Sequence, residues 1–144
     1  MIEQRKLTRK EVAELINDAP DTETRNLVAY IKELNLDAYD FFNIYGIEND
    51  GIVSDGRPIY IGILTKNSNR EHELWTVVNS NVKEQFSLFK LSKRQVSAWS
   101  KKYGNIYATM EKTNPQNIKW TERLGFKRIE ESDNLITFKL NGGI

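Results

Sequence analysis

The sequence predicts an α/β (α+β) protein whose mixed, mainly antiparallel sheet is flanked by helices. Four segments carry apolar residues at helical spacing, and seven shorter segments alternate or are rich in β-branched and aromatic residues. Their order along the chain is β-α-α-β-β-β-α-β-α-β-β. With 144 residues and no change of composition along the chain, we expect a single domain over 1–144.

Two helices are expected in the first quarter of the chain. The pattern Thr8…Glu11 is a capping box, because the hydroxyl and the carboxylate can pair with backbone amides that the first helical turn leaves unpaired. It predicts a helix over 9–17. Apolar residues then recur at i, i+1, i+4 and i+7 from Leu27, and they predict a second helix over 22–35.

The chain then changes to the period of strands. Residues 39–47 are aromatic-rich and fit a strand, although 37–42 also fit a helical turn, and both alternatives stay open. Turn sequences follow at Asn49-Asp50-Gly51 and at Ser54-Asp55-Gly56. The expected strands are 2–7, 39–47, 59–64, 73–78, 105–111, 126–130 and 135–140.

A long helical pattern covers about 83–102. Phe86 and Phe89 are expected to share its buried face. A second capping pattern starts at Ser92, which leaves open whether this helix is broken in two. The pattern ends at Gly104, and a strand follows.

Composition and charge exclude several classes of protein and site. The absence of cysteine excludes disulfides, thiolate metal sites and a cysteine nucleophile, and it fits a reducing compartment. A net charge of +1 gives no field that favours nucleic acid or an acidic membrane. We find neither a signal peptide nor ~20 consecutive apolar residues, so we expect a soluble, cytoplasmic protein. The lone His72 has no partners at metal-binding spacing, and we expect no metal site.

The most specific segment opens at Asn114-Pro115 and closes at Leu124-Gly125-Phe126. Asparagine is a good N-cap, proline suits the first helical position, and glycine suits the left-handed residue after a helix. A short amphipathic helix with two good caps explains the segment by itself. The segment also resembles the signature of the GNAT (N-acetyltransferase) superfamily, in which an Asn opens the helix and Leu-Gly-Phe closes it. The order of elements resembles that superfamily over nearly the whole chain.

The resemblance implies a fold, a cofactor and a reaction. Two central strands, here 73–79 and 105–111, would form the one parallel pair of the sheet and splay apart. Acetyl-CoA would lie in the V, with its pantetheine arm paired to backbone amides and its pyrophosphate at the start of the following helix. An amine of a small molecule or a protein would attack the thioester. The implied cofactor-binding residues are Val77, Val78, Asn79, Val82, Lys83, Glu84, Gln85, Asn114, Asn117 and Trp120.

The chain departs from the superfamily at two places. Family members carry an Arg/Gln-x-x-Gly-x-Gly/Ala loop at the start of that helix, because glycine lets the backbone approach phosphate closely. The corresponding residues 79–87 contain no glycine, and they include the acidic Glu84 and the bulky Phe86. Thr121 stands where the family has its general-acid tyrosine, and a threonine hydroxyl is a far poorer acid than a phenol.

Glu73 is the first candidate for a general base. Alternation along its strand places Glu73, Trp75 and Val77 on one face, which would be the face toward the cofactor. A solvated carboxylate at a strand end explains Glu73 without any catalytic role. Glu111, on the next strand, is a second candidate of the same kind.

A second resemblance is to small GNAT-like proteins of short-tailed phages, described as internal virion or assembly proteins. It covers roughly the second half of the chain and rests on Trp75, Phe86, Tyr103-Gly104, Asn114, Trp120 and Gly125-Phe126. Two functional hypotheses follow. One is an acetyl-CoA-dependent N-acyltransferase with a degenerate phosphate-binding loop. The other is a non-catalytic GNAT-like scaffold with phage protein partners, located in the host cytoplasm or in the virion.

Overall fold

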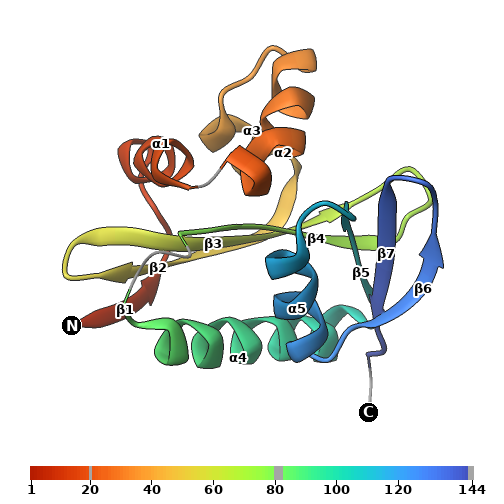
Figure 1. Cartoon of the computed structure of the whole chain (residues 1–144). Helices are drawn as coiled ribbons and strands as arrows, with labels where there is room; N and C mark the ends of the chain where they lie inside the picture. Colours follow the sequence, from red (N-terminus) through yellow and green to blue (C-terminus); the bar gives the residue numbers. More distant parts are fainter. Residues whose placement is uncertain (20, 80–82, 143–144) are drawn as a thin grey trace.

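The computed structural model describes residues 1–19, 21–79 and 83–142, which form one seven-stranded sheet with helices on both faces (Figure 1). The predicted fold class is confirmed, with one additional helix, α3. The elements in chain order are β1 (Ile2–Arg5), α1 (Arg9–Asp18), α2 (Asp21–Glu33), α3 (Ala38–Tyr45), β2 (Gly46–Ser54), β3 (Arg57–Lys66), β4 (His72–Val78), α4 (Gln85–Tyr103), β5 (Ile106–Glu111), α5 (Pro115–Arg123), β6 (Lys127–Glu131) and β7 (Leu135–Leu140).

The strand order in the sheet is β1-β2-β3-β4-β5-β7-β6. Every neighbouring pair is antiparallel except β4 and β5, which are parallel. Parallel neighbours need a crossover connection, and α4 provides it between these two strands. The single parallel pair is therefore where the sequence predicts it.

Helices α1, α2 and α3 cover one face of the sheet over β2, β3 and β4 (Figure 1). The core beneath them includes Val12, Leu15, Phe41, Phe42 and Val77. Each of these side chains is at most 2% exposed, so each contributes roughly 1.5–3 kcal/mol of transfer free energy to folding. The α1–α3 layer thus holds β4 firmly in place.

Helices α4 and α5 lie on the opposite face (Figure 1). Their core includes Val96 and Trp99 of α4, Ile118 of α5, Ile106 of β5 and Phe138 of β7. Side chains along β5 alternate between buried and more exposed. The reason is that, in the described part of the chain, helices cover this strand only on the face that carries α4 and α5 (Figure 1). The other face of β5 is accessible.

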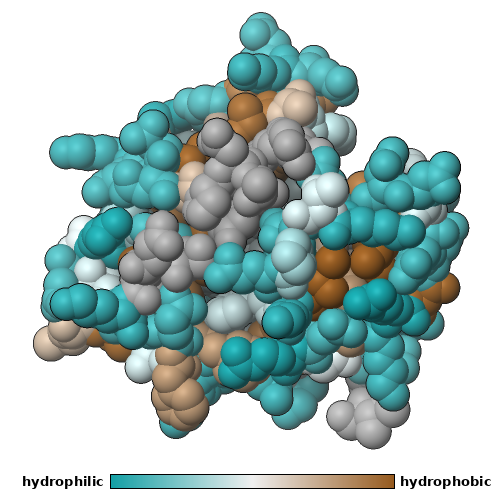
Figure 2. Space-filling model, in the orientation of Figure 1, coloured by the Kyte–Doolittle hydropathy of each residue, from teal (hydrophilic) through white to brown (hydrophobic). Residues whose placement is uncertain are grey.

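Hydrophilic side chains cover most of the molecular face shown in Figure 2, and apolar atoms reach the surface mainly beside α5 and β7. None of the helices within 1–19, 21–79 and 83–142 is long and apolar enough to cross a membrane. Within the same residues, no three His, Cys, Asp or Glu side chains are grouped so that they could hold a metal ion.

The predicted capping box begins α1. The Glu11 amide donates to Thr8 Oγ1 over 3.2 Å, and the Thr8 amide donates to Glu11 Oε1 over 2.9 Å. The guanidinium of Arg5 donates to both oxygens of the same carboxylate, over 2.8 and 2.7 Å. The hydrogen bonds from Arg5, together with the Thr8 amide, lower the pKa of Glu11 to about 2. One carboxylate therefore caps α1 and ties it to β1.

The strand expected over 39–47 is wrong, because most of this segment forms α3. Asp37 caps that helix by accepting a hydrogen bond from the Asp40 amide over 2.8 Å. Arg9 of α1 donates to the carboxylates of both Asp37 and Asp40, so the starts of α1 and α3 share one cation. The alternative of a helical turn over 37–42 is the correct one.

The turn expected at Asn49-Asp50-Gly51 is also wrong, since these residues lie inside β2 and pair with β3. The glycine has a different role, because a Cβ at this position would overlap the side chain of Leu7 in the α1–α3 core. The other expected turn is present. Asp55 and Gly56 connect β2 to β3 with φ angles of 49° and 79°.

Helix α4 is continuous, which excludes the break considered at Ser92. This residue is buried, and its hydroxyl donates to the Phe89 carbonyl over 3.0 Å. The expectation that Phe86 shares a buried face with Phe89 is wrong. Phe86 is 78% exposed in the first turn of the helix, whereas Leu88 is fully buried against the sheet. The face that α4 presents to the sheet begins two residues later than the spacing indicated.

The predicted end of α5 is confirmed. Leu124 is the last residue with helical backbone angles, and Gly125 follows with a φ angle of 103°. A Cβ at Gly125 would meet Leu140 Cδ1 at 3.5 Å, which is an ordinary contact. The cost of a side chain there is therefore conformational rather than steric.

Gly125→Ala should lower the free energy of unfolding by about 1 kcal/mol or more, because alanine disfavours positive φ. Urea unfolding followed by circular dichroism measures the change. Lys119→Ala, at an exposed position inside α5, is the control and should be nearly neutral. Equal stability of Gly125→Ala and the wild type would contradict the assigned helix end.

Candidate functional site

The two parallel strands at the centre of the sheet separate soon after they meet. Pairing between β4 and β5 consists of His72 with Ile106 and Glu73 with Tyr107. All residues of both strands are described, and beyond these pairs the strands have no register in common. Their carboxyl ends therefore form the two arms of a V, as the family resemblance predicts.

The β4 arm presents backbone groups to the V. The Asn79 amide donates to the Ile59 carbonyl of β3 over 2.9 Å. Backbone groups alternate in direction along a strand, so those of Val77 also face β3 and those of Thr76 and Val78 face β5. Since β5 has moved away, this edge of β4 is available for another extended chain.

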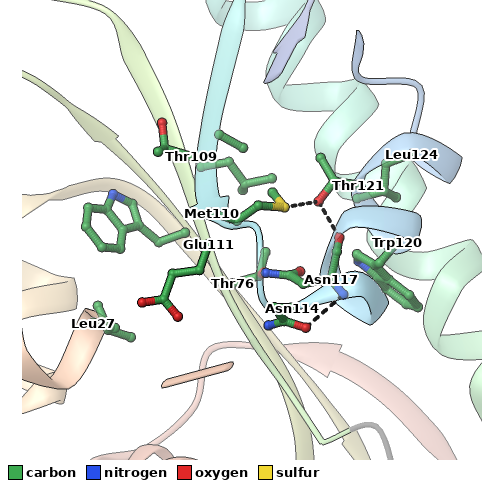
Figure 3. A pocket seen from close by; sticks show the side chains of 13 residues that line it. Leu27, Thr76, Thr109, Met110, Glu111, Asn114, Asn117, Trp120, Thr121 and Leu124 are labelled. Carbon is green, nitrogen blue, oxygen red and sulfur yellow. Dashed lines mark hydrogen bonds between the residues drawn. The ribbon is translucent and has the colours of Figure 1, made fainter. Parts of the chain in front are cut away.

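A narrow pocket with a volume of about 80 Å³ lies between the two arms (Figure 3). Its walls come from α2, β4, β5 and α5. Glu111 is the only ionisable residue among those of the described chain that line it. The lining residues are Leu27, Leu74, Trp75, Thr76, Ala108, Thr109, Met110, Glu111, Asn114, Asn117, Trp120, Thr121 and Leu124.

The pocket has walls on both faces of the sheet. Along β5, Ala108 and Met110 are buried in the α4–α5 core, and Thr109 and Glu111 alternate to the other face. Figure 3 shows Glu111 and Leu27 on one side of the strands and the side chains of α5 on the other. Side chains from both faces of the sheet therefore line the same pocket.

Four site residues expected from the sequence meet at this pocket, on α5 and its cap. They are Asn114, Asn117, Trp120 and Thr121. Asn114 Oδ1 accepts a hydrogen bond from the Asn117 amide over 3.1 Å, which caps the helix as the Asn-Pro start predicts. The start of α5, which forms this wall of the pocket, is therefore determined by its local sequence.

The hydroxyl of Thr121 is engaged within α5. It donates to the Asn117 carbonyl over 2.8 Å and lies 3.6 Å from Met110 Sδ (Figure 3). The side chain is 5% exposed. A hydroxyl has one proton, so Thr121 cannot also protonate a leaving group without breaking this helix bond. Its position at the pocket agrees with the resemblance, but its chemistry does not favour a general acid.

Two carboxylates stand on the face opposite α5, at different depths. Glu73 lies where β4 and β5 still pair, and it is not among the residues that line the pocket. Burial raises the pKa of Glu73, and the negative charge of Glu71 raises it further. A hydrogen bond from Asn67 lowers this pKa but does not cancel the rise. Glu111 lies at the open end of β5 and lines both this pocket and a neighbouring one that includes Asp133. Of these two carboxylates, Glu111 lines the pocket and Glu73 does not.

The remaining expected cofactor-binding residues follow the β4 arm. Val77 points its side chain into the α1–α3 core, and its backbone groups pair with β3. Val78 is the last residue of β4, and the buried Asn79 follows it. The expected residue Val82 lies outside the described residues. Lys83, Glu84 and Gln85 lead into α4, where Glu84 is the N-cap and makes no side-chain capping bond.

Sequence reasoning missed two threonines of the pocket, one on β4 and one on β5. Thr76 and Thr109 both line the pocket. Strand alternation was a usable signal, because it places the backbone of Thr76 on the edge toward β5. No local pattern predicted that Leu27 lines the pocket. This residue belongs to α2, and only the tertiary fold brings it beside β4 and β5.

Glu73→Gln should stabilise the protein at pH 7. A carboxyl whose folded-state pKa lies above its ordinary value of 4.5 binds more protons when folded, so stability falls as pH rises through that interval. Glutamine does not ionise, so the variant avoids this loss of stability. It should be more stable than wild type at pH 7 and about equally stable at pH 4. Thermal unfolding at both pH values measures it, with Glu14→Gln on the exposed face of α1 as control. A variant less stable than wild type at pH 7 would refute the raised pKa.

The chain has the fold of GNAT N-acetyltransferases. It is similar to PH1933 from Pyrococcus horikoshii, with a TM-score of 0.73 and 15% identity over 100% of both chains. It is similar to the GNAT domain of PAT from S. lividans, with a TM-score of 0.69 and 9% identity over 97% of this chain and 89% of that one.

A third similar structure is the N-acetyltransferase PseH of Campylobacter jejuni in complex with acetyl coenzyme A. The TM-score is 0.59 and the identity 13%, over 98% of this chain and 99% of that one. No protein-family model and no curated protein matches the chain. The expected resemblance to the GNAT superfamily is confirmed at the level of the fold.

Proposed function

We propose that the protein binds acetyl-CoA in the V between β4 and β5 and transfers the acetyl group to an amine of a small molecule or a protein. One observation carries the proposal: the strands separate after Glu73 and Tyr107 around a pocket with walls on both faces of the sheet. In this proposal the thioester lies between the strands, and the amine approaches on the face that carries Glu111. The similarity in fold to a protein solved with acetyl coenzyme A supports it.

The residues of the V fit the pantetheine arm of acetyl-CoA. That arm is extended and contains two amides, so it can pair with the backbone groups of Thr76 and Val78 as an added strand does. The pyrophosphate would then lie near the start of α4, where backbone amides are unpaired and the helix dipole favours anions. The carboxylate of Glu84 opposes this, so we expect weaker binding than a glycine-rich loop would give.

Bound acetyl-CoA supplies an acyl carbon that is activated as a thioester. The chain must exclude water, orient the amine and take up the proton that the amine loses as the new C–N bond forms. The C–S bond breaks at the same centre, and CoA would leave as a thiolate that is protonated after release. We assign the proton to Glu111, because it lines the pocket on the face away from α5. Glu73 lies deeper, where the strands still pair, and its buried position suits a structural role.

A non-catalytic GNAT-like scaffold, such as an assembly protein of a phage particle, is the competing proposal. The observation in its favour is Thr121, whose hydroxyl is bonded to the Asn117 carbonyl at the position where family enzymes carry a tyrosine. The loss of glycines before α4 points the same way. The two proposals differ in whether acetyl-CoA binds at all.

Calorimetric titration of the wild-type protein with acetyl-CoA separates them. We expect saturable one-to-one binding with a Kd in the micromolar range, about −8 kcal/mol or weaker, since part of the phosphate contact is missing. Absence of binding at millimolar acetyl-CoA would reject the transferase proposal and support the scaffold.

A panel of amines tests the assignment of the base. Polyamines, amino acids and peptides with free N-termini serve as acceptors, and release of the CoA thiol is followed spectroscopically. Glu111→Gln should lower kcat/KM for the best acceptor about 100-fold while leaving the Kd for acetyl-CoA unchanged. Glu73→Gln should stay within a few fold of wild type. The reverse ranking would return the role to Glu73, and equal rates in all three proteins would show that neither residue accepts the proton.

A further inference from the structure

Aromatic side chains of α2, α3 and β4 form one cluster on the face of the sheet that carries Glu111. The rings of Tyr30 and Trp75 are stacked, with centroids 5.7 Å apart and 28° between their planes. Phe41 meets both rings edge to face, at centroid distances of 5.6 and 6.2 Å. Trp75 also lines the pocket between β4 and β5, so the aromatic cluster continues into the pocket.

Packing of the core accounts for only part of this cluster. Phe41 is 2% exposed, but Tyr30 is 44% exposed although its ring stacks on Trp75. Trp75 is only partly buried. Its indole N–H already donates to Thr65 Oγ1 over 3.1 Å, so its one polar group has a partner. What the indole can offer to a ligand is therefore its apolar ring surface.

The charge of the pocket complements this apolar surface. Leu27, one helical turn before Tyr30 on α2, lines the same pocket as Trp75. Among the described residues that line it, Glu111 is the only ionisable one, and it lies on the same side of the strands as Leu27 (Figure 3). A ligand that enters on this face meets a single carboxylate and an apolar wall.

Resting on the transferase function proposed above, we propose that the acceptor is an apolar amine, with one primary amino group on an alkyl chain or an aromatic ring and no second charge. The nitrogen becomes positively charged as it attacks the thioester, so the carboxylate of Glu111 complements it. The apolar group would pack on Trp75 and Tyr30, where its burial is favourable. A second ammonium at that end would lose its hydration against the rings.

A matched pair of acceptors tests this class. Hexylamine and cadaverine have chains of equal length, and they differ only at the far end, which is a methyl group in hexylamine and a second ammonium in cadaverine. With saturating acetyl-CoA, kcat/KM from CoA release should be about 30-fold higher for hexylamine, because its far end lies against aromatic rings. Equal values would overturn the proposal. A preference for cadaverine would also overturn it and would indicate that the rings bind a cation.

Two tyrosines provide a matched pair of variants. Tyr30 and Tyr45 are 44% and 47% exposed, and both rings lie against Phe41, but of the two it is Tyr30 that stacks on Trp75. Tyr30→Ala should raise the KM for hexylamine about tenfold and leave kcat and the Kd for acetyl-CoA nearly unchanged. Tyr45→Ala should match wild type. Methylamine is too short to reach the rings, so it should react equally with all three proteins. An unchanged KM for hexylamine in Tyr30→Ala would refute the role of the stacked rings.

A binding measurement on the wild-type protein separates this inference from the proposed function and needs no variant that must fold. Hexylamine, added with and without CoA, should give nuclear Overhauser contacts between its alkyl protons and the ring protons of Trp75. If these contacts appear but acetyl-CoA does not bind, the transferase proposal falls and the apolar amine site stands. If acetyl-CoA binds and hexylamine makes no contact with Trp75 in either state, this inference alone falls.

Discussion

The site depends on a parallel pair of strands that is joined at one end only. Each strand has a full-length antiparallel neighbour on its outer side: β3 pairs with β4 from Tyr60 to Lys66, and β7 pairs with β5 along its whole length. The inner edges meet only at His72–Ile106 and Glu73–Tyr107. Because the outer pairings and the crossover helix α4 hold both strands, the gap between them persists, and their backbone groups remain available within it.

This arrangement sets the chemistry that each face can perform. On one face, α5 places amide and indole groups beside the gap, and its own cap and hydroxyl bonds keep that wall rigid. On the other face β5 has no covering helix in the described chain, so Glu111 stands where a second reactant can approach. Burial disfavours the charged form of Glu73, which lies nearer the closed end. The two walls of the pocket therefore differ in polarity: amide and indole groups line one, and a carboxylate lines the other.

Local sequence determined most of what could be predicted. The caps of α1 and α5 and the left-handed Gly125 follow from short local patterns, and the parallel pair follows from the family resemblance and the helix that links its strands. The errors arise from tertiary contacts. Gly51 is a glycine because Leu7 packs against it, and Arg9 supports the start of α3 from a distant helix.

In the proposed complex, acetyl-CoA pairs with the inner edge of β4. Amide hydrogen exchange, resolved by residue, tests it most directly, because Thr76 and Val78 present their amides to the gap and Val77 presents its amide to β3. Saturating acetyl-CoA should slow exchange at Thr76 and Val78 and leave Val77 nearly unchanged. Unaltered exchange at Thr76 and Val78 in the presence of bound acetyl-CoA would contradict the account.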